Sequence, residues 1–432
     1  MNKKNLSAFI KTLILFFLTA SLLSGMLFLS ALIPKEKIRK NCLSSAEYLT
    51  QTEEFFDVIP EHSASRIDRY ADAILLNIAY HYDADYPIRS ALLSAYYFTP
   101  TQDETINYLE AVEKDAGPNQ QYLRYWHGSI LFVRPLLTFL SIRQIYILHG
   151  IVLSVLLAVF LIMAWKYTQK ALAIAMALAL LLTGSWFVPL SLEYTWTFLV
   201  LLISSLIALI LASKGKVQTS SSFFLLTGMV TCFLDFLTTE TLTLLIPLLI
   251  FLWILRPTGR DAWRFTVRCT LNWGIGYVGF WISKWGLTAL VYRENVMPYV
   301  AEHIGERLGG EVGGVGFFTM IAGAILRNVF CLFPLGYGGA GATAAVALLI
   351  AGAYIAYVYR VKEADTKRIL LFSAIGLVPF VRFLILHNHS YVHYFFTYRA
   401  LASTVFAIVL IIAALTGLDA PKSFAGRKRG RT

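Results

Sequence analysis

Two acidic residues, Asp68 and Asp72, are the first candidates for chemistry in this chain. They lie one helical turn apart in a segment, 65–82, where apolar residues recur at helical spacing. Two carboxylates at i and i+4 repel each other on an isolated helix by about 0.2–0.5 kcal/mol. A metal, an arginine or a sugar hydroxyl between them would explain why both are present. Either could also serve as the base that deprotonates an acceptor. A helix capped by Ser65, whose dipole favours an acid in the first turn, explains Asp68 equally well.

Four basic residues form a second set of candidates. Lys284 and Arg382 lie near the ends of apolar segments, and Arg327 lies in the middle of the apolar stretch 317–335. Arg399 begins the last apolar segment. Charges inside a membrane are costly and for that reason commonly functional, although long basic side chains also extend to the interface to reach water. Because guanidinium groups bind phosphate oxygens through paired hydrogen bonds, we expect the four cations to bind the phosphate of a lipid-linked sugar.

The stretch 387–399 is the densest polar and aromatic cluster in the chain. It contains His387, His389, His393 and Tyr394. Three histidines so close together suggest a metal site, but one short loop rarely supplies three ligands with good geometry. Aromatic rings stack on sugars and imidazoles donate to hydroxyls or phosphate, while such residues also anchor proteins at the membrane interface. We expect sugar or acceptor binding here, no metal site, and at most a divalent cation as cofactor.

The composition shows what must position these residues. Hydrophobic residues make up 57% of the 432 residues and charged residues 15%, with a mean hydropathy of +0.63, which indicates a polytopic membrane protein. The high aromatic content excludes disordered and collagen-like chains. The net charge of +11 does not indicate a nucleic-acid partner, because most of the basic residues lie in short loops and at the termini. The four cysteines have no metal or disulfide spacing, so we expect free thiols.

Ten segments are apolar enough and long enough to be read as membrane helices. They are 9–33, 144–165, 171–190, 193–213, 221–238, 241–255, 266–291, 341–359, 369–386 and 398–416. Every second connection is basic, which places both termini in the cytoplasm. The expected organisation is a first helix (1–33), an extracytoplasmic loop with amphipathic helices (34–143), helices 2–7 (144–291), an extracytoplasmic loop with an interfacial helix (292–340), helices 8–10 (341–418) and a basic cytoplasmic tail (419–432). Three acids near the outer ends of segments, Glu193, Asp235 and Glu240, either bind an acceptor or face water.

The run Asp68-Arg69-Tyr70-Ala71-Asp72-Ala73 resembles the acidic motif in the first outer loop of GT-C membrane glycosyltransferases. The likeness is to the protein O-mannosyltransferase and aminoarabinose-transferase branch, and it extends over about residues 60–240. The run Arg124-Tyr125-Trp126-His127-Gly128 and the turn at Arg134-Pro135 also resemble that branch.

The resemblance implies an all-α polytopic fold of about ten transmembrane helices with a large helical first extracytoplasmic loop. It implies transfer of a sugar from a polyprenyl-phosphate donor in the membrane lipid to a cell-envelope glycan, lipid or protein, on the outer face of a bacterial plasma membrane. Asp68 would then be the base and Asp72 would orient the acceptor or a metal. Lys284, Arg327, Arg382 and Arg399 would stabilise the leaving phosphate, and Arg124, Trp126 and His127 would bind sugar or acceptor.

Two other function classes fit the same hydropathy. A transporter or lipid flippase also has about ten spans, but it should carry polar residues at the membrane midplane and related halves, and the sequence has neither. A polysaccharide polymerase or ligase would use outer-face Arg and His in a similar way, and only the early position of the acidic motif speaks against it. The short inner loops and the lack of a Walker A sequence make ATP-driven chemistry within this chain an unexpected function.

Overall fold

Helices make up most of the described chain, and strands make up very little of it. The computed structural model describes residues 3–293, 296, 298–299, 301–302, 305, 314–361 and 365–417. The expected tail, 419–432, and most of the segment 294–313 lie outside the described residues. The only sheet among the described residues is a two-stranded antiparallel one.

Seven helical segments in the described part of the chain are long and apolar enough to cross a membrane. They are 10–31, 142–166, 192–213, 217–234, 335–358, 366–385 and 394–415. The chain is therefore an all-α polytopic membrane protein, as its composition predicts.

All ten segments expected to span the membrane are largely helical. The corresponding helices are α1 (Lys3–Ala31), α7 (Ile142–Lys166), α8 (Lys170–Leu182), α9 (Leu192–Ser213), α10 (Ser220–Leu234), α11 (Leu242–Leu255), α12 (Gly259–Tyr292), α15 (Gly338–Val358), the pair α16 (Thr366–Gly376) and α17 (Val378–Ile385), and α20 (Ala402–Leu415). The 3-10 turns η2 (Ser185–Leu190), η3 (Val217–Thr219), η4 (Leu335–Tyr337) and η5 (Tyr398–Leu401) lie beside them. Two expected spans end early, because α8 stops before Gly184, whose φ is +57°, and α10 stops before Asp235.

Glycines permit α10 and α12 to pack closely against each other. A Cβ at Gly228 would lie 2.1 Å from the carbonyl oxygen of Trp273, and a Cβ at Gly276 would lie 2.2 Å from that of Leu225. Small residues allow such close approach in membranes, where van der Waals packing replaces the hydrophobic effect between helices. Larger residues at Gly228 or Gly276 would push the two helices apart.

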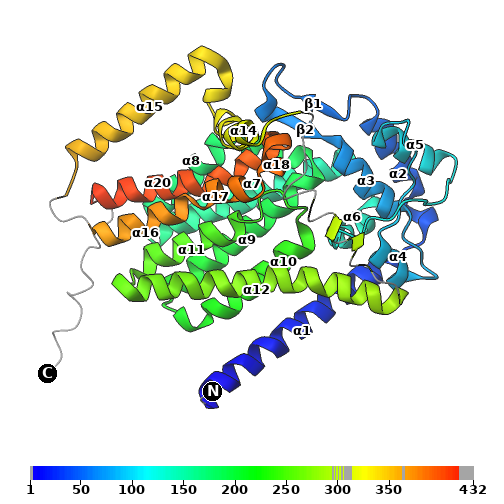
Figure 1. Cartoon of the computed structure of the whole chain (residues 1–432), viewed down its shortest axis with the longest axis horizontal. Coiled ribbons are helices and arrows are strands. Elements are labelled where there is room, and N and C mark those ends of the chain that lie inside the picture. Colours follow the sequence, from blue (N-terminus) through cyan, green and yellow to red (C-terminus); the bar gives the residue numbers. More distant parts are fainter. Residues whose placement is uncertain are drawn as a thin grey trace.

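The loop 34–143 folds into a helical unit at one end of the bundle, on the right of Figure 1. Two buried arginines join its pieces through backbone carbonyls: Arg69 donates to Tyr48 and Leu49, and Arg134 donates to carbonyls that include Ile33. The unit consists of α2 (Lys35–Leu49), β1 (Phe55–Asp57), the 3-10 turn η1 (Ser63–Ser65), β2 (Arg66–Asp68), α3 (Arg69–Tyr80), α4 (Pro87–Leu93), α5 (Glu104–Glu113) and α6 (Ile130–Leu137).

The helix expected at 317–335 is α14 (Phe317–Phe330), which packs on α18 (His387–Val392), α17 and α19 (Tyr394–Thr397). Helices α1 and α15 are apolar and mostly exposed, as is expected of surfaces that face lipid. In Figure 1 both stand away from the bundle.

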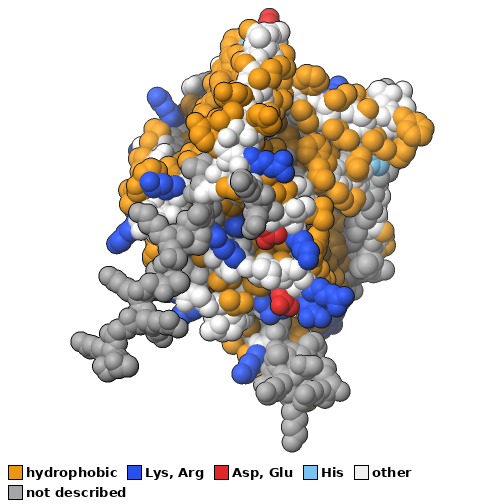
Figure 2. All heavy atoms as spheres, turned by 90° about the vertical axis from the view of Figure 1, so that its left-hand side faces the viewer, with side chains coloured by type: hydrophobic (Ala, Val, Ile, Leu, Met, Phe, Trp, Pro, Cys, Tyr) orange, Lys and Arg blue, Asp and Glu red, His pale blue; other side chains and the backbone are white. Residues whose placement is uncertain are grey.

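Exposed basic residues gather at the end of the molecule opposite the loop unit. Figure 2 shows Lys and Arg side chains concentrated on this face, with few acids among them. They lie at the ends of α7, α9 and α11 and at the starts of α8, α12 and α16. They include Lys166, Lys170, Lys214, Lys216, Arg256, Arg260, Arg264 and Lys367.

Candidate active site

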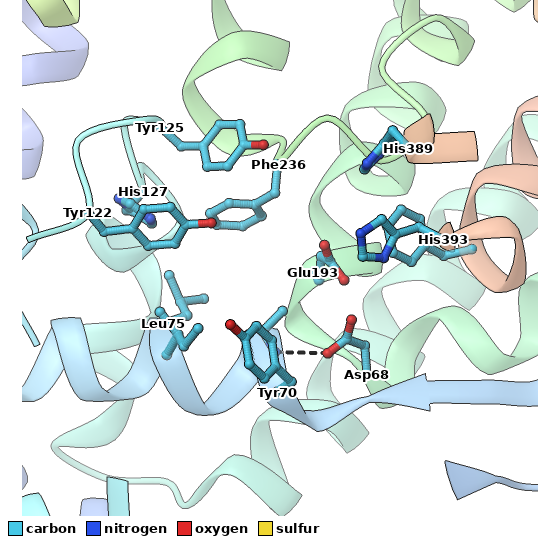
Figure 3. A pocket seen from close by; sticks show the side chains of 13 residues that line it. Asp68, Tyr70, Leu75, Tyr122, Tyr125, His127, Glu193, Phe236, His389 and His393 are labelled. Atoms are coloured by element: carbon cyan, nitrogen blue, oxygen red, sulfur yellow. Dashed lines mark hydrogen bonds between the residues drawn. The ribbon is translucent and has the colours of Figure 1, made fainter. Parts of the chain in front are cut away.

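A cavity of about 80 Å³ lies where the loop unit meets the membrane helices (Figure 3). Residues from separate parts of the chain form its wall: the β2–α3 junction, the loop before α6, the start of α9, the loop between α10 and α11, and the segment 389–396. The lining consists of Asp68, Tyr70, Ala71, Ile74, Leu75, Tyr122, Tyr125, His127, Glu193, Phe236, His389, His393 and Phe396.

Asp68 supplies a buried carboxylate to this cavity. Strand β2 pairs with β1 so that Asp68 lies opposite Phe55, and α3 begins at the next residue. The Asp68 Oδ1 accepts the N–H of Ala71 at 2.8 Å, so this residue is the N-cap of α3 and a lining residue at once. Burial raises the pKa of Asp68 well above its ordinary 3.8; the Ala71 hydrogen bond opposes this rise, and the nearby charge of Asp72 adds to it. Such a carboxylate is basic enough to take a proton near neutral pH.

Glu193 is the second acid in the cavity, and it comes from the first turn of α9. Its side chain is 8% exposed and lies within hydrogen-bonding reach of the Asp68 carboxyl group. Figure 3 shows the two carboxyl groups pointing toward each other, with His393 beside them. Two carboxylates so close together in a buried position would repel each other. The pair therefore has its lowest free energy when the two groups share one proton. The arrangement thus pairs a proton acceptor with a proton donor.

Asp72 does not line the cavity. Its carboxylate is fully buried and accepts the N–H groups of Leu192 and Glu193 at 2.9 and 3.1 Å, the Ser191 hydroxyl at 3.0 Å and the Tyr146 hydroxyl at 2.5 Å. Burial raises the pKa of Asp72 to about 6, and these hydrogen bonds oppose the rise. Asp72 therefore holds the start of α9 against α3, which positions Glu193, and its oxygens are occupied by protein donors.

Aromatic rings make up much of the remaining wall. Tyr70 is 40% exposed and stacks on Phe55, with ring centroids 5.9 Å apart. Tyr125 and Phe236 pack edge to face with ring centroids 5.7 Å apart, and Figure 3 shows Tyr122 beside them on the same side of the cavity. Flat apolar rings with hydroxyl groups at their edges suit the faces and hydroxyls of a sugar. This wall can therefore hold a polar, ring-shaped ligand.

The loop between α10 and α11 is held rigidly, which fixes Phe236 in the wall. The Asp235 carboxylate accepts the Thr197 hydroxyl at 2.6 Å. The Leu237 carbonyl accepts His389 Nε2 and the Arg382 guanidinium, both at 2.9 Å. Two lining residues, Phe236 and His389, are thus tied to one backbone segment.

None of the four cations predicted to bind phosphate lines the cavity. Arg382 forms a buried two-bond ion pair with Glu240, at 2.7 and 2.9 Å. Arg399 lies between the rings of Tyr194 and Tyr398 and donates to carbonyls. Arg327 is exposed, over the rings of Tyr391 and Tyr394. Lys284 is fully buried behind His127, where its Nζ lies 3.5 Å from the Ser94 hydroxyl.

The other predicted site residues divide between the lining and its support. His127, His389 and His393 line the cavity with Asp68, whereas Trp126 is buried behind it and donates to the Phe280 carbonyl at 2.9 Å. The guanidinium of Arg124 lies over the Tyr122 ring at 4.7 Å. His387 and Tyr394 lie outside the lining, His387 against the Phe317 ring and Tyr394 under Arg327.

Sequence reasoning did not assign Glu193, Tyr70, Tyr122 and Phe236 to the site. Glu193 carried a signal, because an acid at the outer end of an apolar segment is unusual. The aromatic residues carried none, since tyrosine and phenylalanine are abundant throughout this chain.

The described residues contain no cluster of three or more His, Cys, Asp or Glu side chains that could hold a metal ion. The four cysteines are free and buried, as expected. The chain matches no known protein family, no curated protein and no solved structure.

Proposed function

We propose that the protein is an integral-membrane glycosyltransferase that transfers a sugar from a polyprenyl-phosphate donor to a hydroxyl group of a cell-envelope acceptor. The proposal includes the GT-C-like arrangement of about ten spans. The observation that carries it is the Asp68 carboxylate, which is buried, has a raised pKa and faces an aromatic cavity.

The cavity supports a single displacement at the sugar. A general base must lie within hydrogen-bonding distance of the acceptor hydroxyl, and its pKa should lie near the working pH. Asp68 has the raised pKa that this role needs, and Glu193 keeps the second carboxyl group within reach of it. The aromatic wall would hold the sugar ring between this acid pair and the His127 end of the cavity.

The position of the cavity fits a donor that stays in the membrane. Its wall comes partly from the loop unit and partly from the ends of membrane helices, so a lipid-linked sugar could reach it with its tail still in the bilayer. The basic face in Figure 2 lies at the other end of the molecule, and by the positive-inside rule it is the cytoplasmic face. The cavity is then on the outer side of a bacterial plasma membrane.

A transfer assay tests this function. Purified protein in detergent receives a panel of polyprenyl-phosphate sugars together with cell-envelope glycans, lipids and proteins, and release of free polyprenyl phosphate is measured. We expect release that depends on both donor and acceptor. No release with any pair, from protein whose folding is confirmed by thermal unfolding, would contradict the proposal and favour a transporter.

A further inference from the structure

A buried lysine without an acidic partner lies behind one end of the cavity. Lys284 is 0% exposed, and among the described residues its ammonium group contacts only the Ser94 hydroxyl, at 3.5 Å, and the Trp126 ring, at 5.7 Å. No carboxylate of the described chain pairs with it. Burying an unpaired charge costs several kcal/mol by general estimate, so proteins rarely keep one without a use.

Ser94 connects this lysine to a residue of the cavity wall. The Ser94 Oγ lies 3.0 Å from Nδ1 of His127, and its other neighbour is the Ala91 carbonyl at 3.2 Å. An ammonium group can only donate, so Ser94 Oγ accepts from Lys284. Its own hydrogen goes either to the Ala91 carbonyl or to His127 Nδ1, and in the second arrangement the imidazole hydrogen is on Nε2.

His127 Nε2 has no hydrogen-bond partner in the described protein, although the side chain is 1% exposed and lines the cavity. The residue also adopts a left-handed backbone with φ of +50°, which a non-glycine residue keeps only when its surroundings impose it. Gly128 supplies one such constraint: its N–H donates to the Phe233 carbonyl at 2.9 Å, and a Cβ there would lie 2.4 Å from that oxygen. The fold thus holds an imidazole nitrogen without a protein partner at the cavity wall.

The two ends of the cavity differ in charge. Burial lowers the pKa of His127 well below its ordinary value, and the positive charges of Lys284 and Arg124 lower it further, so both cations lie near this imidazole. In Figure 3, His127 and Tyr122 lie at one side of the cavity, and Asp68, Glu193 and His393 lie at the other. One end therefore has two cations and an imidazole nitrogen without a protein partner, while the other carries the acid pair.

We propose that the His127 end of the cavity is a phosphate-binding subsite, in which His127 Nε2 donates to a phosphate oxygen and Lys284 supplies the balancing charge through Ser94. The inference rests on the proposed function for its ligand, a polyprenyl phosphate, and it adds which residues hold that group. Of the four cations expected from the sequence to bind phosphate, it keeps Lys284, and it puts His127 in place of the three arginines. In a displacement, the nucleophile and the leaving group lie on opposite sides of the reacting carbon. A phosphate bound at His127 and a base at Asp68 would lie on opposite sides of the reacting carbon.

A binding measurement tests the subsite without any turnover. Full-length protein in a phosphate-free polyoxyethylene detergent is titrated with farnesyl phosphate, a short polyprenyl monophosphate, and with farnesol, which lacks the phosphate. We expect the phosphate to bind about tenfold tighter or better, as hydrogen bonds to charged groups allow. The variants are Lys284→Met, which keeps the chain length, and His127→Phe, which keeps a ring. Both should lose most of the preference for phosphate and keep the affinity for farnesol.

Controls separate this subsite from other causes. Lys35→Met removes a lysine of the loop unit that has an acidic partner, Asp115, and it should keep the full preference. Because Lys284 has no such partner, Lys284→Met should unfold at the same or a higher temperature than wild type. Competition by inorganic phosphate that Lys284→Met abolishes would support recognition of the anion itself. Competition only by farnesyl phosphate, again lost in the variant, would support a lipid-linked phosphate.

Three results would overturn the subsite: equal affinity of wild type for farnesyl phosphate and farnesol, an undiminished preference in both variants, or an equal loss in Lys35→Met. The proposed function can fail separately. A protein that binds farnesyl phosphate through Lys284 but releases none from any sugar donor would keep the subsite and contradict the transferase.

Discussion

The carboxyl groups of Asp68 and Glu193 lie within hydrogen-bonding reach of each other, one at the start of α3 and the other in the first turn of α9. Asp72 fixes this relationship, because it lies one turn after Asp68 and binds the N–H of Glu193. The two acids of the motif therefore have different tasks. Asp68 faces the cavity, and Asp72 places the partner of Asp68.

The raised pKa of Asp68 predicts that transfer depends on pH. A base works only when it has lost its proton, so turnover should rise with pH through a midpoint well above the ordinary aspartate value of 3.8. The hydrogen bond with Glu193 lowers the pKa of Asp68, so Glu193→Leu should move the midpoint to higher pH, whereas Glu193→Gln, which can still donate, should move it less. Initial rates measured across pH at saturating donor check this. If the pH midpoint of transfer is the same in both Glu193 variants, the predicted coupling between Glu193 and Asp68 is contradicted.

Replacing Asp72 should damage the fold rather than the chemistry. Asp72→Asn places an amide group among four hydrogen-bond donors in a fully buried position, and at least one of them loses its partner. We expect the free energy of unfolding to fall by about 2 kcal/mol or more. Thermal unfolding of the purified protein measures this. Asp103→Asn is the matched control, because the exposed Asp103 side chain makes no capping bond, and an equally large loss there would contradict the argument.

The buried pair of Arg382 and Glu240 predicts a large loss on one substitution and a partial recovery on two. Arg382→Met leaves the Glu240 carboxylate buried and unpaired, which should cost about 3–5 kcal/mol of stability. The double variant Arg382→Met, Glu240→Gln removes both charges and should regain part of it. Denaturation midpoints are measured for the wild type, for the single variants Arg382→Met and Glu240→Gln, and for the double variant. Simple additivity of the two single losses would show that the pair is not coupled.

Hydropathy predicted where the helical segments lie, because a span must be apolar throughout and satisfy its own backbone, and seven of these segments are long and apolar enough to cross a membrane. Their ends were less predictable. The helix expected over 221–238 stops at Leu234, since the Asp235 carboxylate turns back onto Thr197, Leu237 and Thr238. Such contacts depend on the neighbouring helix and leave no local signal in the sequence.

Single residues of the site were predictable where an unusual residue pattern marked them. Asp68 stood out as one of two acids a helical turn apart, His389 and His393 as members of a dense polar cluster, and His127 through the family resemblance. The cavity brings these residues together. The partners of the cations could not be predicted from the sequence. Arg382 binds Glu240, and Lys284 contacts Ser94, across long stretches of chain. A basic residue at a helix end has the same sequence signature whether it binds a ligand, an acid or a carbonyl.

The most direct test of the central claim is to measure sugar transfer by wild type and Asp68→Asn under single-turnover conditions, with the unfolding temperature of each. Asparagine is as good an N-cap as aspartate and can still accept the Ala71 N–H, so the fold should be retained. Loss of a general base should slow transfer by about 100-fold or more. The account predicts a slow variant with nearly unchanged stability. Full transfer by a folded Asp68→Asn protein would contradict it and leave Asp68 as a helix cap alone.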